Sequence, residues 1–507
     1  MGQCCGGIQG MESEGPARAV GSVSEEWGYT QELPRVVRFI QSFAVGFSQI
    51  SITAGIFGTL GVVLLSSGPL GAWTTWLITG VGFTLVALVY ATLASRVPLT
   101  GHGYQYVSKI ASGEVGWMVG WLTLLLTGIA SLSVAYSVAA FVLPPLFGYT
   151  STALNADLVA GGVFLLYMIL TMLSTRITAV INEYAVYTEL IGMVGFSIVL
   201  FLVVAIHGGL HWSYLLSQGP AHQTNFWSLG LVGGQDSAFV LAFVMALFTL
   251  FGFEACANVA EEMKDDPRTS VPRAIFLAEV VAAAAGLVVL LLILPAAGHL
   301  KSVEAAPSAL AYVMSEQLGP VGGKLFLIVV LYSVFACGLV LFLSTARMIW
   351  AMSRDDRFFA SGALRRVHAG LGTPFNASVA VGVVGLIVFA AFITQANVWN
   401  QLIGATSFPP FIIYPTVVIV FLVKRRHLPK PRSFNLGRLE VPVAVLALVW
   451  IAFGLSVFKS GFNPALAYTG GAIVLGVGYL AWYRRGHGPM TVPAGTGGDQ
   501  VGSQSTV

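Results

Sequence analysis

The sequence predicts an all-α polytopic membrane protein with twelve transmembrane helices, and three observations carry this prediction. Hydrophobic residues make up 56% of the 507 residues, charged residues make up 9%, and the mean hydropathy is +0.82. A soluble domain carries about 25% charged residues. The chain also contains twelve apolar runs near the roughly 20 residues that a span needs. Finally, the basic residues gather in alternate connections between those runs.

Each apolar run is predicted to form one helix. In chain order the predicted spans are 39–64, 71–94, 115–143, 156–174, 184–206, 237–260, 274–298, 323–350, 375–394, 402–423, 440–458 and 466–483.

The distribution of charge predicts the orientation of these spans. With a cytoplasmic N-terminus and one crossing per run, 22 of the 25 Lys and Arg residues are cytoplasmic, and Lys301, Lys324 and Lys459 are outside. This is the asymmetry of the positive-inside rule. We therefore expect a plasma-membrane protein with both termini in the cytoplasm. Its tails would be residues 1–36 and a disordered, Gly- and Ser-rich segment 486–507.

Several residue types are placed in ways that argue against an enzyme. No His lies inside an apolar run, and no H-E-x-x-H motif occurs. Cys256 and Cys337 lie in separate apolar runs, while Cys4 and Cys5 lie in the N-terminal tail, so neither a disulfide framework nor a metal site is expected. We expect no catalytic residue, no metal and no cofactor.

The stretch "ISITAGIFGTLG" weakens the first predicted helix near its middle. Glycine inside a helix costs about 1 kcal/mol relative to alanine. The spacing Gly55-x-x-Gly58-x-x-Gly61 can serve close helix packing. Alternatively the backbone unwinds there, which membranes tolerate only where protein or a water-filled cavity covers it.

A second interrupted helix favours unwinding. The sixth run contains "FTLFGFEACANVAEE", with Gly252 and the ionisable Glu254. The first run points outward and the sixth inward, so repeats 37–206 and 237–423 would be inverted in the membrane. Interrupted helices at matching places of inverted halves indicate the binding site of a secondary transporter. Glu254 is interpreted either as a cap for the inner half of its helix or as a titrating group.

Such breaks also suggest the ligand. If the first helix unwinds around Thr53 to Gly55, its outer half begins near Ile56, and its free N–H groups favour a carboxylate. Unwinding at Gly252 leaves free carbonyls that favour an ammonium group. The pair of breaks therefore suits a zwitterionic amino acid.

Three motifs carry a resemblance to a known family. They are "EEWGYTQELPRVVRF" leading into "GFSQISITAGIF", then "FGFEACANVAEEMKDDPRTSVPRAI", and "PLTGHGYQYV". The last resembles a P-x-x-G-G-x-Y pattern in which His102 replaces the second glycine. On these motifs the chain resembles the amino acid–polyamine–organocation (APC) superfamily, and within it the amino acid/choline/GABA permease branch.

The resemblance implies a core of ten helices, residues 37–423, built as two inverted five-helix repeats. A basic cytoplasmic loop, 424–439, and two peripheral helices, 440–485, would follow. The implied substrate-binding residues lie at the two breaks. They are Ser51, Thr53, Ala54, Gly55 and Ile56 in the first helix, and Phe248, Phe251, Gly252 and Phe253 in the sixth. Phe248 resembles an aromatic residue that closes over substrate, although a core or lipid-facing phenylalanine explains it equally.

Glu189, in "YAVYTELIGMVGF", has two interpretations. It either reaches toward the cytoplasmic surface or pairs with Arg176, or it approaches helices 1 and 8, where relatives hold sodium or a cation that replaces it. In the second case it is a proton carrier or the counter-charge of a cationic substrate. Hydroxyl groups that can supply sodium ligands in helix 8 are those of Ser333, Ser344 and Thr345.

The function predicted is secondary active import of an amino acid or related amine, coupled to a proton and working by alternating access. Sodium coupling, an amino acid/amine exchanger and a non-transporting amino acid sensor are the alternatives. The expected partners are a small-molecule substrate (amino acid, GABA, choline or polyamine), the coupling ion and the lipid bilayer, with no nucleic acid. The mixed-charge run "EEMKDDPRTSVPR" is expected to form an ion-pair network that fixes helix 6.

Overall fold

The computed structural model describes residues 23–219, 226–227, 238–306, 308–392, 402, 405–431, 433–457 and 463–490. Within these residues the regular structure is helical, apart from one isolated bridge between Val37 and Met263. The prediction of an all-α polytopic fold is confirmed at this level. Several predicted features lie outside the described residues. They are residues 1–22 of the N-terminal tail (with Cys4, Cys5 and Arg18), Arg432, Lys459, the tail beyond residue 490, and residues 237, 393–394, 403–404 and 458 of the predicted spans.

The first half of the chain is bounded as follows. It contains α1 (Val23–Glu26), α2 (Phe39–Ile50), α3 (Ile52–Arg96), α4 (His102–Ile110), α5 (Gly113–Ser137), η1 (Val138–Val142), α6 (Leu143–Phe147), α7 (Ala153–Leu173), α8 (Thr175–Tyr187), η2 (Thr188–Val194), α9 (Gly195–Ile206) and η3 (Trp212–Leu216). Here η1 and η2 are π-helical turns that continue their neighbouring helices.

The second half follows the same plan of long helices joined by short ones. It contains α10 (Ala238–Thr249), η4 (Phe253–Glu262), α11 (Pro267–Ile293), α12 (Leu300–Ala305), α13 (Ala309–Arg354), α14 (Ser361–Leu364), α15 (Phe375–Phe392), α17 (Pro410–Lys424), η5 (Arg425–His427), η6 (Gly437–Leu439), α18 (Glu440–Val457) and α19 (Asn463–His487).

Ten helical segments among the described residues are long and apolar enough to cross a membrane. The longest, Phe39–Arg96, contains two of the predicted runs. They meet at Gly68, whose φ of 64° interrupts the helix just before Pro69. A β-carbon on Gly68 would lie 2.2 Å from the Gly219 nitrogen, so only glycine fits. Phe375–Ala391 is apolar but shorter than the ten segments. The chain is a multi-pass membrane protein, and twelve crossings remain a prediction.

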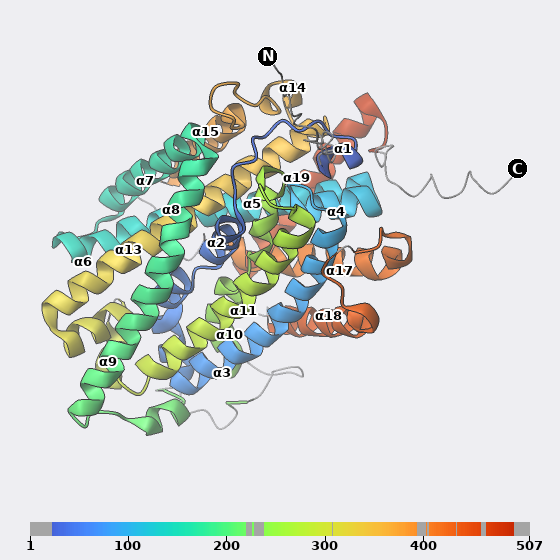
Figure 1. Ribbon diagram of the computed structural model, residues 1–507. Coiled ribbons are helices and arrows are strands. Elements are labelled where there is room, and N and C mark those ends of the chain that lie inside the picture. The colour runs from blue at the N-terminus through green and yellow to red at the C-terminus, as the bar shows by residue number, and fades with distance from the viewer. Residues whose placement is uncertain are drawn as a thin grey trace, which may run out of the picture.

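The long helices run between two ends of the molecule (Figure 1). We call the end that carries α1, α4 and α14 the basic end, and the end that carries η3 the opposite end. α3 packs along α10 and α11, and α13 packs along α5. The outer helices present large apolar side chains to the surroundings, as at Ile191 and Val474, which are 73% and 71% exposed. This surface suits contact with lipid, while the α3–α10–α11 group positions the site.

We expect His102, which stands where the P-x-x-G-G-x-Y pattern has its second glycine, to make the stability of the fold sensitive to acid. It begins α4 with a φ of 25°, is buried, and its Nδ1 has no hydrogen-bond partner in the described part of the chain. Burial lowers the pKa of His102 to about 3. An unfolded histidine titrates near 6.5, so below about pH 6.5 the unfolded chain binds a proton that the native state does not. The free energy of unfolding therefore decreases as the pH is lowered below 6.5, and at pH 5 it is about 2 kcal/mol smaller than at neutral pH.

We expect His102→Gly to lose less thermal stability than the wild type between pH 7 and pH 5, measured by thermal unfolding in detergent. Equal losses in the two proteins would contradict the assignment of this acid sensitivity to His102.

Candidate functional site

The first helix is broken at Ser51, between α2 and α3. Ser51 is buried and left-handed, with φ 40° and ψ 90°. Its N–H donates to the Phe47 carbonyl, which closes α2, and its Oγ accepts a hydrogen bond from the Ala54 N–H, which begins α3. The expected unwinding around Thr53 to Gly55, with an outer half starting near Ile56, is wrong in position. A serine can both end one helix and cap the next, so the break needs this one residue.

Glu189 lies directly at this break. Its Oε1 accepts hydrogen bonds from the Thr53 N–H at 2.7 Å and from the Ser51 hydroxyl at 3.1 Å. Its Oε2 has no hydrogen-bond partner in the described residues, and the side chain is 0% exposed. The interpretation that it reaches the surface is therefore wrong. The N–H end of α3, which we expected to receive the carboxylate of a ligand, receives the carboxylate of Glu189 instead.

The second break lies between α10 and η4. Gly252 has a φ of 107°, and a β-carbon there would lie 2.9 Å from Cγ of Gln49. Its N–H donates to the Tyr414 hydroxyl at 3.3 Å. That hydroxyl donates to the two carboxylate oxygens of Glu254 at 3.2 and 3.1 Å. Glu254 therefore stands in the first turn of η4 with a partner from α17, and whether it also titrates remains a prediction.

Gln49 joins the two breaks to the predicted helix 8, which is the later part of α13. The Ser344 hydroxyl donates to its Oε1 at 2.7 Å, and the Cys337 thiol contacts its carbonyl at 3.7 Å. Thr345 binds the Leu341 carbonyl, and its Oγ1 lies 2.8 Å from that of Thr127. These two hydroxyl groups of helix 8 therefore hold neighbouring helices together.

The other predicted contact residues of the first helix line the start of α3. Thr53, Gly55 and Ile56 are buried and Ala54 is partly exposed. A β-carbon on Gly55 would lie 1.9 Å from Oγ1 of Thr249, so α3 and α10 approach closely there. Gly55 therefore serves close packing of α3 on α10, as one interpretation of the sequence expected. The helix break lies one turn earlier, at Ser51.

The predicted contact residues of the sixth helix differ in their surroundings. Phe253 is 0% exposed, and its ring stacks on Tyr414 with centroids 5.6 Å apart and meets Tyr90 edge-on at 5.8 Å. Phe251 is 6% exposed. Phe248 is partly exposed, which suits either a movable gate or a core position.

Sequence reasoning missed three side chains of this region. Gln49 and Tyr414 carry no signal of their own, because a glutamine or tyrosine in an apolar run is unremarkable until its partner is known. Glu279 does carry a signal. It is an acid inside the run "AIFLAEVVAAAAG", the same feature that identified Glu254. It is fully buried, and neither carboxylate oxygen has a hydrogen-bond partner in the described residues.

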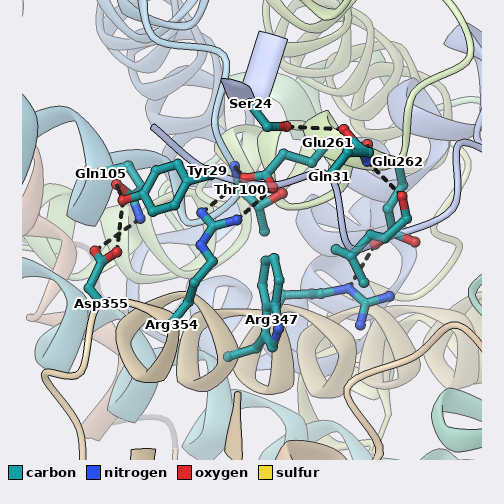
Figure 2. Close-up of polar contacts among 12 residues, drawn as sticks. Ser24, Tyr29, Gln31, Thr100, Gln105, Glu261, Glu262, Arg347, Arg354 and Asp355 are labelled. Carbon is teal, nitrogen blue, oxygen red and sulfur yellow. Dashed lines mark hydrogen bonds and ion pairs between the residues drawn. The ribbon is translucent and has the colours of Figure 1, made fainter. Parts of the chain in front are cut away.

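The basic end is fastened by ion pairs between η4 and α13 (Figure 2). Arg354 donates to both oxygens of Glu261, at 2.6 and 3.1 Å. Arg347 and Glu262 form a second pair at 2.8 Å, with both side chains 0% exposed. The expected ion-pair network that fixes helix 6 is confirmed at Glu261 and Glu262.

Residues 24–37, which we call the N-terminal strap, lie across this end. The N–H groups of Val36 and Val37 donate to the Glu262 carbonyl, and the Gln31 amide donates to the Glu261 carbonyl. The Tyr29 ring lies 3.8 Å from the Arg354 guanidinium, and its hydroxyl donates to Asp355 at 2.7 Å.

Asp355 is the shared acceptor of this arrangement, because the Tyr104 hydroxyl of α4 also donates to it. Burial, followed by the charge of Asp355, raises the pKa of Tyr29 and of Tyr104 above the usual range. Both hydroxyls therefore keep their protons at neutral pH and remain donors. These contacts join the strap, α4, α13 and η4 at the basic end.

Gly252 should be intolerant of any side chain. Gly252→Ala forces a left-handed alanine against Gln49, which we expect to cost about 1–3 kcal/mol of stability and to disturb the break between α10 and η4. Gly162→Ala in α7 is the matched control, since no atom of the described residues lies within 4 Å of the β-carbon it would add. Thermal unfolding and uptake, measured on both variants, check this. Equal behaviour of the two would contradict the constrained break.

Comparisons with known proteins identify the family. A family model for amino acid permeases matches residues 37–481. Amino-acid permease BAT1 of Arabidopsis thaliana is 25% identical over 480 residues, covering 88% of this chain and 89% of the relative. The GABA-specific permease of Saccharomyces cerevisiae is 23% identical over 504 residues, covering 92% and 85%. The methylthioribose transporter of Bacillus subtilis is 24% identical over 440 residues, covering 85% and 89%.

The family-model match spans both helix breaks and almost all of the helical segments. The resemblance to APC permeases is confirmed, and membership of a permease family makes the protein a transporter rather than an enzyme. The chain belongs to the amino acid permease family.

Proposed function

We propose that this permease imports an amino acid or related amine together with a proton, by alternating access around the breaks at Ser51 and Gly252. One observation carries the proposal. Glu189 is fully buried at the first break, with one oxygen hydrogen-bonded and the other without a partner in the part of the chain that the structure describes. A carboxylate in that position can accept a proton on the free oxygen without disturbing the bonds that hold the break. Buried acids of this kind mark proton pathways in transporters.

The same acid bears on substrate choice. With Glu189 at the N–H end of α3, the first break already holds a negative charge, so a ligand carboxylate gains less there than the sequence alone suggested. We therefore favour substrates recognised mainly through an amino or quaternary ammonium group, such as GABA, choline, polyamines or basic amino acids. A relative named as a GABA-specific permease supports this class.

We further propose the full topology. It comprises twelve crossings, inverted repeats at 37–206 and 237–423, two peripheral helices, and both termini in the cytoplasm of a plasma-membrane protein. Support comes from the charge distribution and from breaks in two helices that start five runs apart. In this topology the basic end is cytoplasmic, and the unit formed by the strap, α4, α13 and η4 is the closed inner gate.

Transport by purified protein in liposomes tests the function. A labelled panel of neutral, basic and acidic amino acids, GABA, choline and putrescine is offered with and without an inward proton gradient, and with or without preloaded substrate. Gradient-driven uphill uptake of an amine is the expected result. Movement only against preloaded substrate would establish an exchanger and remove the proposed role of Glu189. Saturable binding without any flux would identify a sensor.

A further inference from the structure

Glu279, on α11, is a second buried acid for which the proposed coupling site has no use. Its side chain is 0% exposed, and both carboxylate oxygens lack hydrogen-bond partners among the described residues. An ionised carboxylate in such a place carries a desolvation cost that no cation or hydrogen bond from the described residues offsets. The side chain must therefore be neutral or bind something that neutralises it.

Its electrostatic neighbour is Glu254, whose charge acts on Glu279. The geometry agrees, because α11 packs against η4. A β-carbon placed on Gly46 would lie 3.3 Å from the Ala278 side chain and 3.1 Å from the Phe253 carbonyl. Those two residues directly precede Glu279 and Glu254 in the sequence, so η4 and α11 approach each other beside α2 one residue before each acid.

Cations on the surrounding elements are already engaged or remote. Helices α2 and α9, which also pack on α11, contain no ionisable residue. On α3 the ionisable residues are Tyr90 and Arg96, and Arg96 pairs with Glu440. Glu189 on η2 faces Ser51 and Thr53. Among the cations of α11, Arg268 pairs with Glu26 and Arg273 is exposed. In η4, Glu261 pairs with Arg354 and Glu262 pairs with Arg347. The remaining ionisable groups of η4 and around Glu254 are Cys256, Tyr106 and Tyr414.

We propose that Glu279 is a second proton-binding site, which exchanges its proton with the carboxylate of Glu254. The hydrogen bonds decide which acid holds the proton. Glu254 accepts from the Tyr414 hydroxyl, which stabilises its ionised form. Glu279 has no donor among the described residues, so burial favours its protonated form. Two buried carboxylates that act on each other, with no cation among the described residues to pair with Glu279, disfavour simultaneous ionisation.

The Glu279 and Glu254 site is linked by hydrogen bonds to the break at Gly252, just as Glu189 is linked by hydrogen bonds to the break at Ser51. The Gly252 N–H donates to Tyr414, and Tyr414 donates to Glu254. Movement of η4 at Gly252 would break the Tyr414 contact and so let the Glu279 proton pass to Glu254. This role in the cycle rests on the proposed transport function, but the protonation of Glu279 does not.

Infrared spectroscopy of purified protein at neutral pH, in H₂O and D₂O, tests the proposal without any substrate. The wild-type minus Glu279→Gln difference spectrum should contain the C=O stretch of a protonated carboxyl group that shifts in D₂O. Glu316→Gln, an exposed acid at the opposite end, should show loss of an ionised carboxylate instead. If the Glu279→Gln difference spectrum instead shows loss of an ionised carboxylate, the proposal is overturned.

Glu254→Gln provides an independent test if the first variant fails to fold. Removal of the neighbouring carboxylate should leave the protonated band of Glu279 in place but shift its frequency, since its nearest charge is gone. An unchanged frequency would show that the two acids do not interact and would overturn the exchange. Because neither spectrum depends on flux, a protein that proves not to transport would still give a definite answer on Glu279.

Discussion

Glu189→Gln should abolish proton-driven accumulation while leaving the protein folded. Glutamine keeps one acceptor oxygen, so the Thr53 N–H and the Ser51 hydroxyl retain their partner at the first break. The amide cannot take up a proton, however. One pH unit is worth about 1.4 kcal/mol, so a one-proton symporter accumulates substrate about tenfold per unit of gradient. We expect this ratio to fall to one in the variant, measured as steady-state uptake into liposomes.

Glu183→Gln is the matched control on the same helical segment. Glu183 lies six residues earlier, accepts a hydrogen bond from Gln41, and its side chain is 17% exposed. It should retain the accumulation of the wild type. Accumulation by Glu189→Gln equal to that of Glu183→Gln would show that Glu189 only caps α3.

The second large effect is expected at the buried pair of Arg347 and Glu262. Arg347→Met leaves the Glu262 carboxylate fully buried without its counter-charge, which typically costs about 3–5 kcal/mol. The double variant Arg347→Met/Glu262→Met removes both charges and should recover most of that loss. Thermal unfolding in detergent of the two single variants and the double variant provides the cycle.

Arg365→Met supplies the comparison on the surface. Its pair with Asp356 is 2.8 Å long but exposed at 46% and 66%, so we expect a loss of about 1 kcal/mol or less. Equal losses in Arg347→Met and Arg365→Met would mean that the Arg347–Glu262 pair does not hold η4 to α13. A double variant as unstable as Arg347→Met would lead to the same conclusion.

The sequence predicted the class of fold because hydropathy and loop charge are local properties that a single chain displays directly. It also located both breaks to within a few residues, since glycines and an acid in apolar runs are visible without any contact. The first break was placed too late because Ser51 can cap α3 by itself. Gly55 is needed because α3 and Thr249 of α10 lie close together there, and that contact depends on tertiary packing.

The partners of the acids could not be predicted in the same way. Glu189 and Ser51 are 138 positions apart, and Tyr414 and Glu254 are 160 apart. Pairs at such separations depend on which helices become neighbours, and hydropathy does not encode that. Glu279 could have been found, because it carries the same local signal as Glu254. The ion pairs at the basic end were predicted only as a mixed-charge run, without the arginines of α13 that complete them.

Simultaneous measurement of substrate and proton flux tests the central claim most directly. Liposomes containing the protein and a pH-sensitive dye, with equal pH on both sides, receive an amine substrate from the outside. Our account predicts that the lumen acidifies as substrate enters, with one proton per substrate, and that Glu189→Gln shows no acidification. Substrate entry only into preloaded liposomes, with no change in lumenal pH, would contradict it.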